Sequence, residues 1–422
     1  MFSLKPECCT MLDQLFRQRL EMLFDSANIT IDGNRPWDIR VHDRRMFRKT
    51  VLQGNLGFGE SYMESGWDCD DLEELFCRIL SAGLDQRLVT LTALLEYLQG
   101  ALINLQKPAR AFTVGKRHYD AGNDLFRAML DPWMMYSCAC WREAESLQEA
   151  QEHKLGLIFD KLALEPGMTL LDIGCGWGGA AKYAAEHYGA RVVGITISKE
   201  QARYAREFCK EFDVDIRLMD YRQLDGEFDR IVSIGMLEHV GHKNFRTYFD
   251  TARRCLKPEG RMLVQSIGSN TPVTSTDPWI EKYIFPNSML PSVSQIASGF
   301  EGRFVLEDWH SLSYDYALTL KAWERNVTRN WQQLEHQYDD TFYRMWRYYL
   351  LSCAGAFRAR TIQLWQILLT PSGIKGACCI PRQPARQRFR DRGNGQEKPH
   401  RMPAADRERH REFPRSGAAA ES

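Results

Sequence analysis

The sequence predicts an α/β protein with three parts: a small α/β accessory domain (1–105), a main domain with a parallel sheet covered by helices on both faces (106–370), and a disordered tail (371–422). Three observations lead to this fold class. Strand-like and helix-like segments alternate through the middle of the chain, a glycine-rich turn joins one strand to a helix, and the composition changes after residue 370. Alternating strands and helices are typical of a parallel sheet, because each connection between parallel strands must cross the sheet.

The accessory domain mixes short elements of both kinds. Strand-like segments at 29–31 and 39–41 enclose the turn-forming sequence Asp-Gly-Asn at 32–34, and helical periodicity follows at 72–82 and 89–99. This pattern predicts a small α/β unit. Its sequence alone indicates no chemistry.

The main domain begins with a basic linker at 106–118, which Pro108 interrupts, and continues with helices up to residue 165. Five strands then recur with helices between them, at 169–174, 191–198, 215–220, 230–235 and 261–268. Two further candidate strands, 304–309 and 362–369, are separated by an aromatic-rich helical stretch at 316–357 that we interpret as a helical lid. Together these segments predict a seven-stranded sheet with an antiparallel strand at one end.

The turn after the first of these strands carries the strongest local signal. It has the sequence Leu-Asp-Ile-Gly-Cys-Gly-Trp-Gly-Gly over 171–179. Glycine lets the backbone take positive φ and approach a ligand closely, and the start of the following helix presents unpaired N–H groups. Ligands of such sheets bind at the carboxyl ends of the strands. The turn therefore predicts a nucleotide site, of a kind that many dinucleotide-binding proteins share.

Charge is distributed unevenly along the chain, although the formal total over 422 residues is zero. Residues 371–422 contain twelve Lys or Arg and six Asp or Glu, a net charge of +6, which leaves −6 on residues 1–370. Few aliphatic residues follow Ile380, so the tail cannot bury enough apolar surface to offset the entropy of ordering. We expect a disordered tail and favour a solvated appendage over an arm that binds lipid or nucleic acid.

Cysteine usage and hydropathy narrow the cellular setting. The twelve cysteines are scattered, the N-terminus lacks a secretion signal, and the adjacent pairs at 8–9 and 378–379 lack further ligands at metal-binding spacing. We therefore expect a reduced, cytoplasmic protein without a metal site. No run of about 18 apolar residues is present, so any contact with lipid is expected to be peripheral.

Polar residues at the ends of the other strands distinguish between two nucleotide cofactors. A nicotinamide dinucleotide fold usually has an acid at the end of its second strand, which holds the ribose hydroxyls. Here that strand ends without an acid, and Thr196 and Gln201 are available for the ribose. The third strand ends in residues suited to the amine and ring of an adenine: Asp220, Tyr221 and Arg222. With Asp172 available to the loop N–H groups or to the amino acid part of the cofactor, the set favours S-adenosylmethionine and a class I methyltransferase fold of the Rossmann-like kind.

Several separate motifs resemble those of one family. They are HYDAGNDLF at 118–126, YSCACW at 136–141, the glycine turn, GMLEHVG at 235–241, EDWH at 307–310 and CAGAFRAR at 353–360. In these motifs, and over about 28–369 as a whole, the chain resembles the cyclopropane-fatty-acyl-phospholipid synthases, which belong to the cyclopropane fatty acid and mycolic acid synthase family of methyltransferases. The resemblance implies transfer of a methylene group from S-adenosylmethionine to a cis double bond in an acyl chain of a membrane phospholipid. It implies that the cofactor also contacts Tyr136, Ser137, Gly174, Cys175, Gly176, Trp177 and Gly178.

The resemblance also implies how the reaction ends. Methyl transfer to an alkene leaves a carbocation, and in this family the base that removes a proton so that the ring closes is understood to be a bound bicarbonate. The residues that the resemblance assigns to it are Cys138, Glu238, Gln265, Ile267 and Tyr316, with Ile267 and Cys138 acting through the backbone. Glu238 would accept from the bicarbonate hydroxyl and orient the base. We favour this role over the alternative of a helix N-terminal acid stabilised by the helix dipole.

Two residues depart from the family pattern, which often has His at the position of Gln265 and an aromatic residue at that of Cys140. A Gln amide donates a hydrogen bond to an anion but cannot be charged, so a lower affinity for bicarbonate is expected. Cys140 removes a ring that would face the cation or serve packing. Cys353, an older candidate nucleophile in such enzymes, is expected to be a small packing residue, because direct transfer needs no covalent enzyme intermediate. The apolar loop at 277–286 either caps the acyl tunnel or packs against the sheet.

Access to the membrane and the partners follow from the same resemblance. The accessory domain and the basic residues Lys107, Arg110, Lys116 and Arg117 are candidates for docking on anionic headgroups, each cation contributing about 1 kcal/mol. We expect a homodimer at the inner face of the cytoplasmic membrane and no nucleic-acid partner. Two alternatives stay open. One is a lipid C-methyltransferase with a methyl-branched or methylene product, and the other is a homologue that binds cofactor and lipid but has lost catalysis.

Overall fold

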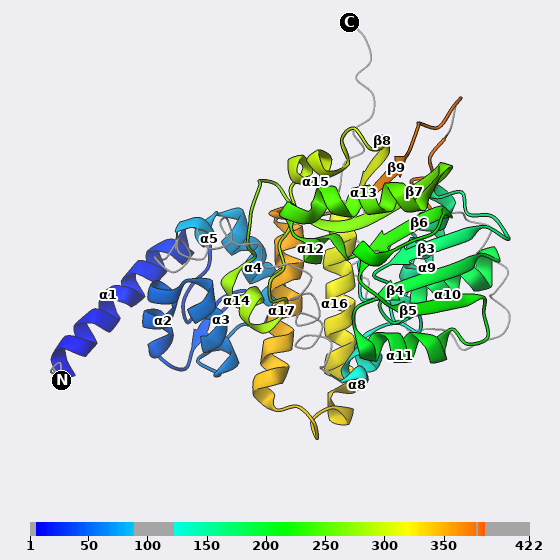
Figure 1. Ribbon diagram of the computed structural model, residues 1–422. Coiled ribbons are helices and arrows are strands. Elements are labelled where there is room, and N and C mark those ends of the chain that lie inside the picture. The colour runs from blue at the N-terminus through cyan, green and yellow to red at the C-terminus, as the bar shows by residue number, and fades with distance from the viewer. Residues whose placement is uncertain (1–5, 88–121, 377–378, 385–422) are drawn as a thin grey trace, which may run out of the picture.

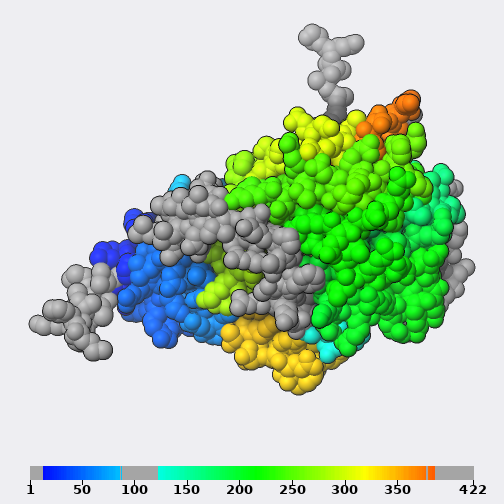
Figure 2. Space-filling view, in the orientation of Figure 1, coloured from blue at the N-terminus to red at the C-terminus, as the bar shows by residue number. Residues whose placement is uncertain are grey.

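The computed structural model describes residues 6–87, 122–376 and 379–384 (Figure 1). A seven-stranded sheet with its covering helices forms one side of the molecule, and helices from the first 87 residues, one long and the others short, form the other (Figure 1 and Figure 2). Two long helices, α16 (Ser313–Asn330) and α17 (Asp340–Arg358), stand between them. The predicted α/β class, with a large sheet domain, a small N-terminal part and helices resembling a lid, is confirmed.

The sheet contains every strand that the sequence predicts for it. Its strands are β3 (Thr169–Ile173), β4 (Arg191–Thr196), β5 (Val214–Leu218), β6 (Phe228–Ile234), β7 (Leu256–Ser269), β8 (Val305–Ser311) and β9 (Ile362–Thr370). They lie in the order β5-β4-β3-β6-β7-β9-β8, and the first five of this order run parallel. The glycine turn follows β3, in the middle of the parallel strands, where ligands of such sheets bind.

The expected antiparallel strand at one end of the sheet was wrong in its position. β9 is the antiparallel strand, and it pairs with β7 on one side and β8 on the other, so the end strand β8 runs parallel to the first five. Burial explains the order. β9 is buried at every position after its first, as an inner strand must be, whereas β8 is mostly half-buried or exposed.

Helices cover both faces of the sheet. Those of the main domain are α8 (Asn123–Met129), α9 (Leu147–Lys161), α10 (Gly179–Tyr188), α11 (Lys199–Phe208), α12 (Leu237–Val240), α13 (Phe245–Cys255), α14 (Pro278–Tyr283) and α15 (Val293–Phe300). α9 and α10 share a core with Leu170 and Leu263, and α13 and α15 share another with Leu171 and Val264. Neighbouring residues of a strand point to opposite faces, so each strand that is covered twice needs apolar residues in both registers.

The N-terminal part is more helical than the sequence predicts. Its elements are α1 (Pro6–Asp25), β1 (Arg40–Val41), α2 (Arg45–Gln53), α3 (Asn55–Met63), β2 (Trp67–Asp68), α4 (Leu72–Ser81) and α5 (Leu84–Arg87). The predicted helix at 72–82 is confirmed as α4, but the predicted strand at 29–31 is irregular and contributes a single bridge between Ile31 and Ile39. The predicted helix at 89–99, the linker and the boundary at residue 105 lie outside the described residues.

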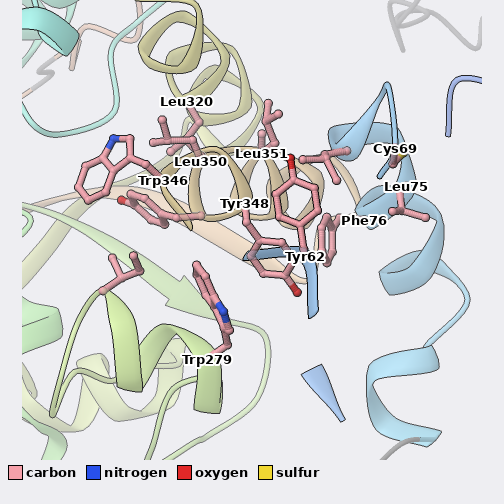
Figure 3. Close-up of a cluster of buried hydrophobic side chains, with 14 of the residues drawn as sticks. Tyr62, Cys69, Leu75, Phe76, Trp279, Leu320, Trp346, Tyr348, Leu350 and Leu351 are labelled. Atoms are coloured by element: carbon pink, nitrogen blue, oxygen red, sulfur yellow. The ribbon is translucent and has the colours of Figure 1, made fainter. Parts of the chain in front are cut away.

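The N-terminal helices and the lid helices share one hydrophobic core. Figure 3 shows Tyr348 of α17 beside Tyr62 and Phe76 of the N-terminal part, and the ring centroids are 5.7 and 5.0 Å from that of Tyr348. The Trp279 ring of α14 lies 4.5 Å from the same tyrosine ring. These aromatic contacts hold the N-terminal helices against the main domain, as face and edge arrangements of large rings do.

Gly355 of α17 provides a test of this packing. A Cβ at this position would lie 2.7 Å from the carbonyl oxygen of Glu73 and 2.7 Å from Cβ of Phe76, both on α4. We expect Gly355→Val to lower the free energy of unfolding by about 2 to 3 kcal/mol, because the added atoms overpack two helix backbones. Denaturant unfolding measures the change. Gly122→Ala, whose Cβ would have its closest contact at 3.5 Å, serves as control, and equal stability of the two variants would contradict the close approach of α17 and α4.

The start of the tail also differs from the expectation. Residues 371–376 and 379–384 lie against the main domain, where Arg382 forms an ion pair with buried Asp308 and Ile380 packs against the core that α9 and α10 share. The N–H of Ile374 donates to Oε1 of Glu307 at 2.8 Å. These contacts hold the segment against the main domain, so the disordered tail expected from residue 371 does not begin there. Residues 385–422 lie outside the described residues.

Candidate active site

A cavity of about 180 Å³ lies at the carboxyl ends of the parallel strands, and we call it the polar cavity because Asp172, Asp220 and Arg222 line it. Twelve of the thirteen residues predicted to bind the cofactor line it: Tyr136, Ser137, Asp172, Gly174, Cys175, Gly176, Trp177, Thr196, Gln201, Asp220, Tyr221 and Arg222. Gly178 is the exception. The sequence therefore brings together nearly the whole predicted set around one space, and its binding of a cofactor stays a prediction.

Gly178 and Gly179 allow the neighbouring segments to pack closely around this cavity. Gly178 has φ +87° at the start of α10, and a Cβ there would lie 3.0 Å from the side chains of Ala205 and Cys209 on α11. A Cβ on Gly179 would lie 1.9 Å from the carbonyl oxygen of Trp133. Only glycine permits both the left-handed backbone and these approaches. The turn thereby lets α11 and the 133–137 segment close around the cavity.

The residues predicted for the ribose and adenine are paired with one another. The Thr196 hydroxyl donates to Oε1 of Gln201 at 2.9 Å, which directs the amide N–H groups of Gln201 away from this bond. Asp220 accepts from the backbone N–H of Arg222 at 2.9 Å and from its guanidinium at 2.8 Å. The guanidinium lies over the Tyr221 ring, 4.8 Å from its centroid. These bonds fix the orientation of the polar groups before any ligand is bound.

Asp172 is the buried acid of the cavity. Its Oδ2 atom has no hydrogen-bond partner in the described part of the chain, and burial raises the pKa of the carboxyl to about 7. A buried carboxylate oxygen without a partner is costly unless a donor or cation reaches it. Asp172 is therefore suited to a cationic group of a ligand, one of the two roles that the sequence left open.

Lys154 of α9 was missed by sequence reasoning. Its side chain is fully buried and Nζ donates to Oγ of Ser137 at 3.2 Å. Gln151, one turn earlier, donates to the carbonyl oxygen of Ser137 at 2.9 Å, so two α9 side chains hold the 135–137 segment in place. Electrostatic attraction from the Lys154 ammonium lowers the pKa of Asp172, in opposition to burial. The position of Lys154 in the sequence could have indicated that it is buried, because residues 151, 154, 155 and 158 share one face of a helix.

A second and larger cavity, of about 540 Å³, adjoins the first. All six residues predicted for catalysis line it: Cys138, Glu238, Gln265, Ile267, Tyr316 and Cys353. Apolar residues of the N-terminal part complete its wall: Leu23, Phe24, Phe58, Phe76, Ile79, Leu80 and Leu84. Sequence reasoning assigned the N-terminal part to membrane docking and missed this contribution, because residues so far apart in the chain give no common pattern.

The apolar loop at 277–286 forms part of the same wall. It contains α14, and Asp277, Trp279, Ile280 and Phe285 line the larger cavity. Asp277 accepts from the N–H groups of Trp279 and Ile280, which begins the helix, and its other oxygen accepts from Asn55 of α3 at 2.8 Å. Of the two interpretations that the sequence allowed, the geometry supports a cap on the cavity, held in place by the N-terminal part.

A polar cluster lies where the larger cavity meets the sheet. The N–H of Ile267 donates to Oε1 of Glu238 at 2.6 Å, while Oε2 of Glu238 has no partner among the described residues. Nε2 of Gln265 donates to the carbonyl oxygen of Cys138 at 3.3 Å, and Gln366 of β9 donates to Oε1 of Gln265 at 3.0 Å. Burial raises the pKa of Glu238 to about 7. Gln366 was missed, although the two glutamines of a buried, mostly apolar strand, Gln363 and Gln366, were a signal.

The thiols of this region are poor nucleophiles. Burial raises the pKa of Cys353 to about 12 and that of Cys138 well above its ordinary value, so both remain protonated near neutral pH. This agrees with the expectation that Cys353 has no nucleophilic role. Cys140 is buried and lines neither cavity, so an aromatic residue at that position would serve packing rather than face a cation.

Four residues line both cavities: Tyr136, Ser137, Gly235 and His239. The Tyr136 hydroxyl is 2.8 Å from that of Tyr349 on α17, so the shared wall is bonded to the lid. Burial lowers the pKa of His239 to about 4, which keeps its ring neutral. The two cavities therefore adjoin at uncharged groups that line both of them. A ligand in the polar cavity would lie directly beside one in the apolar cavity.

Among the described residues, no three His, Cys, Asp or Glu side chains gather as a metal site would require. None of the helices that the structure describes has the length and apolar character needed to span a bilayer.

Comparison with known proteins agrees with this architecture. A sequence model of the mycolic acid cyclopropane synthetase family matches residues 106–367. Cyclopropane-fatty-acyl-phospholipid synthase of Escherichia coli K12 is 51% identical over 371 residues, which cover 88% of this chain and 97% of the relative. A probable fatty acid methyltransferase of Pseudomonas putida is 39% identical over 277 residues, covering 63% of this chain and 70% of the relative.

Solved structures give the same result. The cyclopropane synthase MmaA2 from Mycobacterium tuberculosis superposes with a TM-score of 0.58 at 35% identity, covering 61% of this chain and 97% of that one. A mycolic acid cyclopropane synthase solved with SAH and CTAB has the same score, identity and coverage. From the sequence match, the superposition and the paired cavities, we conclude that this chain belongs to the mycolic acid cyclopropane synthetase family of S-adenosylmethionine-dependent methyltransferases.

Proposed function

We propose that this protein is a cyclopropane-fatty-acyl-phospholipid synthase, which transfers a methylene group from S-adenosylmethionine to the cis double bond of an unsaturated phospholipid acyl chain. The observation that carries the proposal is the pair of cavities that share Tyr136, Ser137, Gly235 and His239. The polar cavity suits a nucleoside with an amino acid group, and the apolar cavity suits an acyl chain. Reaction requires the two ligands to come into contact where the cavities adjoin.

Within the polar cavity, Asp172 and the Asp220–Arg222 pair are the groups that would hold the cofactor. S-adenosylmethionine supplies the electrophilic methyl group. The chain would hold the two ligands in position and keep water away from them. Tyr136 and Ser137 would cover the cofactor where the cavities adjoin, and the α14 cap would exclude water from the acyl chain in the larger cavity. The Tyr316 ring, stacked on that of Phe357 at 4.6 Å, offers an aromatic face to a cation formed in the larger cavity.

The polar cluster around Glu238 supports a bound anion as the base. Bicarbonate would supply the basic oxygen that removes the proton. Oε2 of Glu238 is a buried acceptor without a partner in the described part of the chain and would take the bicarbonate hydroxyl. The Gln265 amide and the Tyr316 hydroxyl would donate to the other oxygens. The N–H of Ile267 is bonded to Glu238, so it would reach the anion only as a shared donor or after Glu238 has turned.

Dependence on bicarbonate is the test of that base. We expect turnover to fall when dissolved CO₂ is rigorously removed and to recover when bicarbonate is added. Gln265→His should lower the bicarbonate concentration needed for half-maximal rate, because a protonated ring donates to an anion more strongly than a neutral amide does. Initial rates over a bicarbonate titration measure both. An unchanged rate without CO₂ in wild type would contradict bicarbonate as base.

The activity itself is tested with vesicles of dioleoyl phospholipid and labelled S-adenosylmethionine. We expect label in the lipid and a three-membered ring in the NMR spectrum of the product. The likeness to a probable fatty acid methyltransferase supports one alternative, a lipid C-methyltransferase, for which the spectrum would show a methyl branch or methylene group. Cofactor binding without label in lipid would indicate instead a homologue that has lost catalysis.

The substrate also sets the place of action. A double bond in a phospholipid is reached only at a membrane, so the proposal includes peripheral association with the inner face of the cytoplasmic membrane. It also includes a homodimer, which the family resemblance supports. The basic residues first considered for docking, Lys107, Arg110, Lys116 and Arg117, lie outside the described residues.

A further inference from the structure

Exposed apolar side chains gather on two N-terminal helices. Leu15 and Met22 of α1 and Leu52 of α2 have 54, 70 and 53% of their surface exposed, and they are three of the seven large hydrophobic residues exposed in the described part of the chain. Leu15 and Met22 are seven residues apart and therefore share a face of their helix. α1 and α2 pack against each other. Single exposed apolar residues are ordinary, but these three lie on two helices that pack together, and we call them the apolar patch.

Basic residues accompany this patch. Arg19 is exposed and lies four residues after Leu15, on the same face of α1. Arg48 is exposed and lies four residues before Leu52, on the same face of α2. α1 ends at Asp25, which is exposed three residues after Met22, so an acid lies beside this face at the end of the helix. A surface that mixes apolar and basic side chains is typical of helices that lie in a membrane interface.

The patch adjoins the larger cavity. Leu23, next to Met22, and Gln53, next to Leu52, both line that cavity. Gln53 and Asp85 are exposed as well as lining, so the wall of the cavity reaches the surface between α2 and α5. An acyl chain that entered there would pass the patch before it reached Glu238.

We propose that the outward face of α1 and α2, defined by Leu15, Arg19, Met22, Arg48 and Leu52, is the surface that docks on a phospholipid bilayer. The apolar side chains enter the acyl region, the two arginines meet headgroup phosphates, and an acyl chain passes into the cavity beside them. The inference rests on the proposed function, since the adjoining apolar cavity needs a chain that only a bilayer supplies. That continuity favours a bilayer over a protein partner.

Vesicle binding tests the apolar half of the surface. In co-sedimentation with dioleoyl phosphatidylglycerol vesicles, we expect Met22→Ser/Leu52→Ser to bind about tenfold more weakly than wild type. The matched control is Leu218→Ser/Val293→Ser, which changes two side chains 39 and 48% exposed on the sheet domain and should bind as wild type does. Arg19→Gln/Arg48→Gln should weaken binding to these vesicles but not to dioleoyl phosphatidylcholine vesicles, because only the former are anionic.

Two further measurements separate docking from other roles. Turnover on dioleoyl lipid dispersed in detergent micelles should be unchanged in Met22→Ser/Leu52→Ser, and light scattering should show the mass of the wild-type particle. Wild-type affinity of this variant for vesicles, or a change in its oligomeric state, would overturn the proposal. If wild type binds vesicles through this face but forms no ring on any lipid, the docking surface stands and the proposed function fails.

Discussion

Glu238→Gln is expected to lower kcat by at least about thirtyfold, on the scale of about 2 kcal/mol for one preorganised polar group at a reacting centre. Glutamine retains an oxygen that can accept from the Ile267 N–H, so the local fold should persist. What is lost is the negative charge at Oε2, the buried acceptor that would orient the base. Affinity for S-adenosylmethionine should be nearly unchanged, because Glu238 does not line the polar cavity.

The pH profile gives the same prediction a second readout. Burial raises the pKa of Glu238 to about 7, so below that pH the carboxyl is protonated and loses the negative charge that would hold the bicarbonate hydroxyl. Wild-type kcat should therefore rise as pH increases through about 7, whereas the variant, which has no group to ionise at this position, should lack that rise. Steady-state rates from pH 6 to 9 would show the difference. Full activity of the variant, with the wild-type profile, would remove Glu238 from the site.

Much of the sheet was predictable from sequence because each strand is short, buried and bounded by turns. The mostly apolar sequence at 362–369 also indicated an inner strand, which the prediction of an antiparallel end strand did not take into account. A strand buried at every position after its first must have neighbours on both sides, and β9 lies between β7 and β8 for that reason. By contrast, the isoleucines at 29–31 gave a strand signal, but only Ile31 found a partner. A segment with high strand propensity forms a regular strand only where the fold places another strand beside it.

The candidate site was predictable where its residues sit in continuous motifs. The glycine turn and the segments 136–138, 235–241 and 265–267 carry most of it, and the topology brings their strand ends to one place. The wall from the N-terminal part was not predictable, since Phe24, Phe58 and Phe76 have no shared spacing and read as ordinary core residues. Their role in the cavity depends on packing against α17, which only the folded chain reveals.

Lys154 shows why a buried charged residue is difficult to predict from sequence motifs. It lies in a largely buried helix of mixed polar and apolar sequence, donates one hydrogen bond to Ser137, and acts on the other charged groups through space. The charged groups around it are Asp131, which accepts from the N–H groups of Trp133 and Met135, and Asp172 of the polar cavity. The thiol of Cys138 is close but neutral. Burial lowers the pKa of the Lys154 ammonium and raises those of both carboxyls, so each charge depends on the others.

Lys154→Met is expected to raise the Kd for S-adenosylmethionine about thirtyfold at pH 7, the scale of one lost charge-assisted hydrogen bond. The pKa of Asp172 is about 7, and attraction to Lys154, whose own pKa burial lowers to about 7, is what opposes burial there, so removing Lys154 moves the pKa of Asp172 higher and leaves more of the carboxyl protonated. Binding in wild type should tighten as pH rises through about 7, and in the variant the same rise should come at higher pH. Calorimetric titration from pH 6 to 9 measures this.

S-adenosylhomocysteine, which keeps the α-ammonium but lacks the sulfonium charge, should lose affinity by the same factor. Ser137→Ala removes the hydrogen bond but not the charge, so it should keep the wild-type midpoint. Equal midpoints in Lys154→Met and wild type would show that Lys154 serves packing alone.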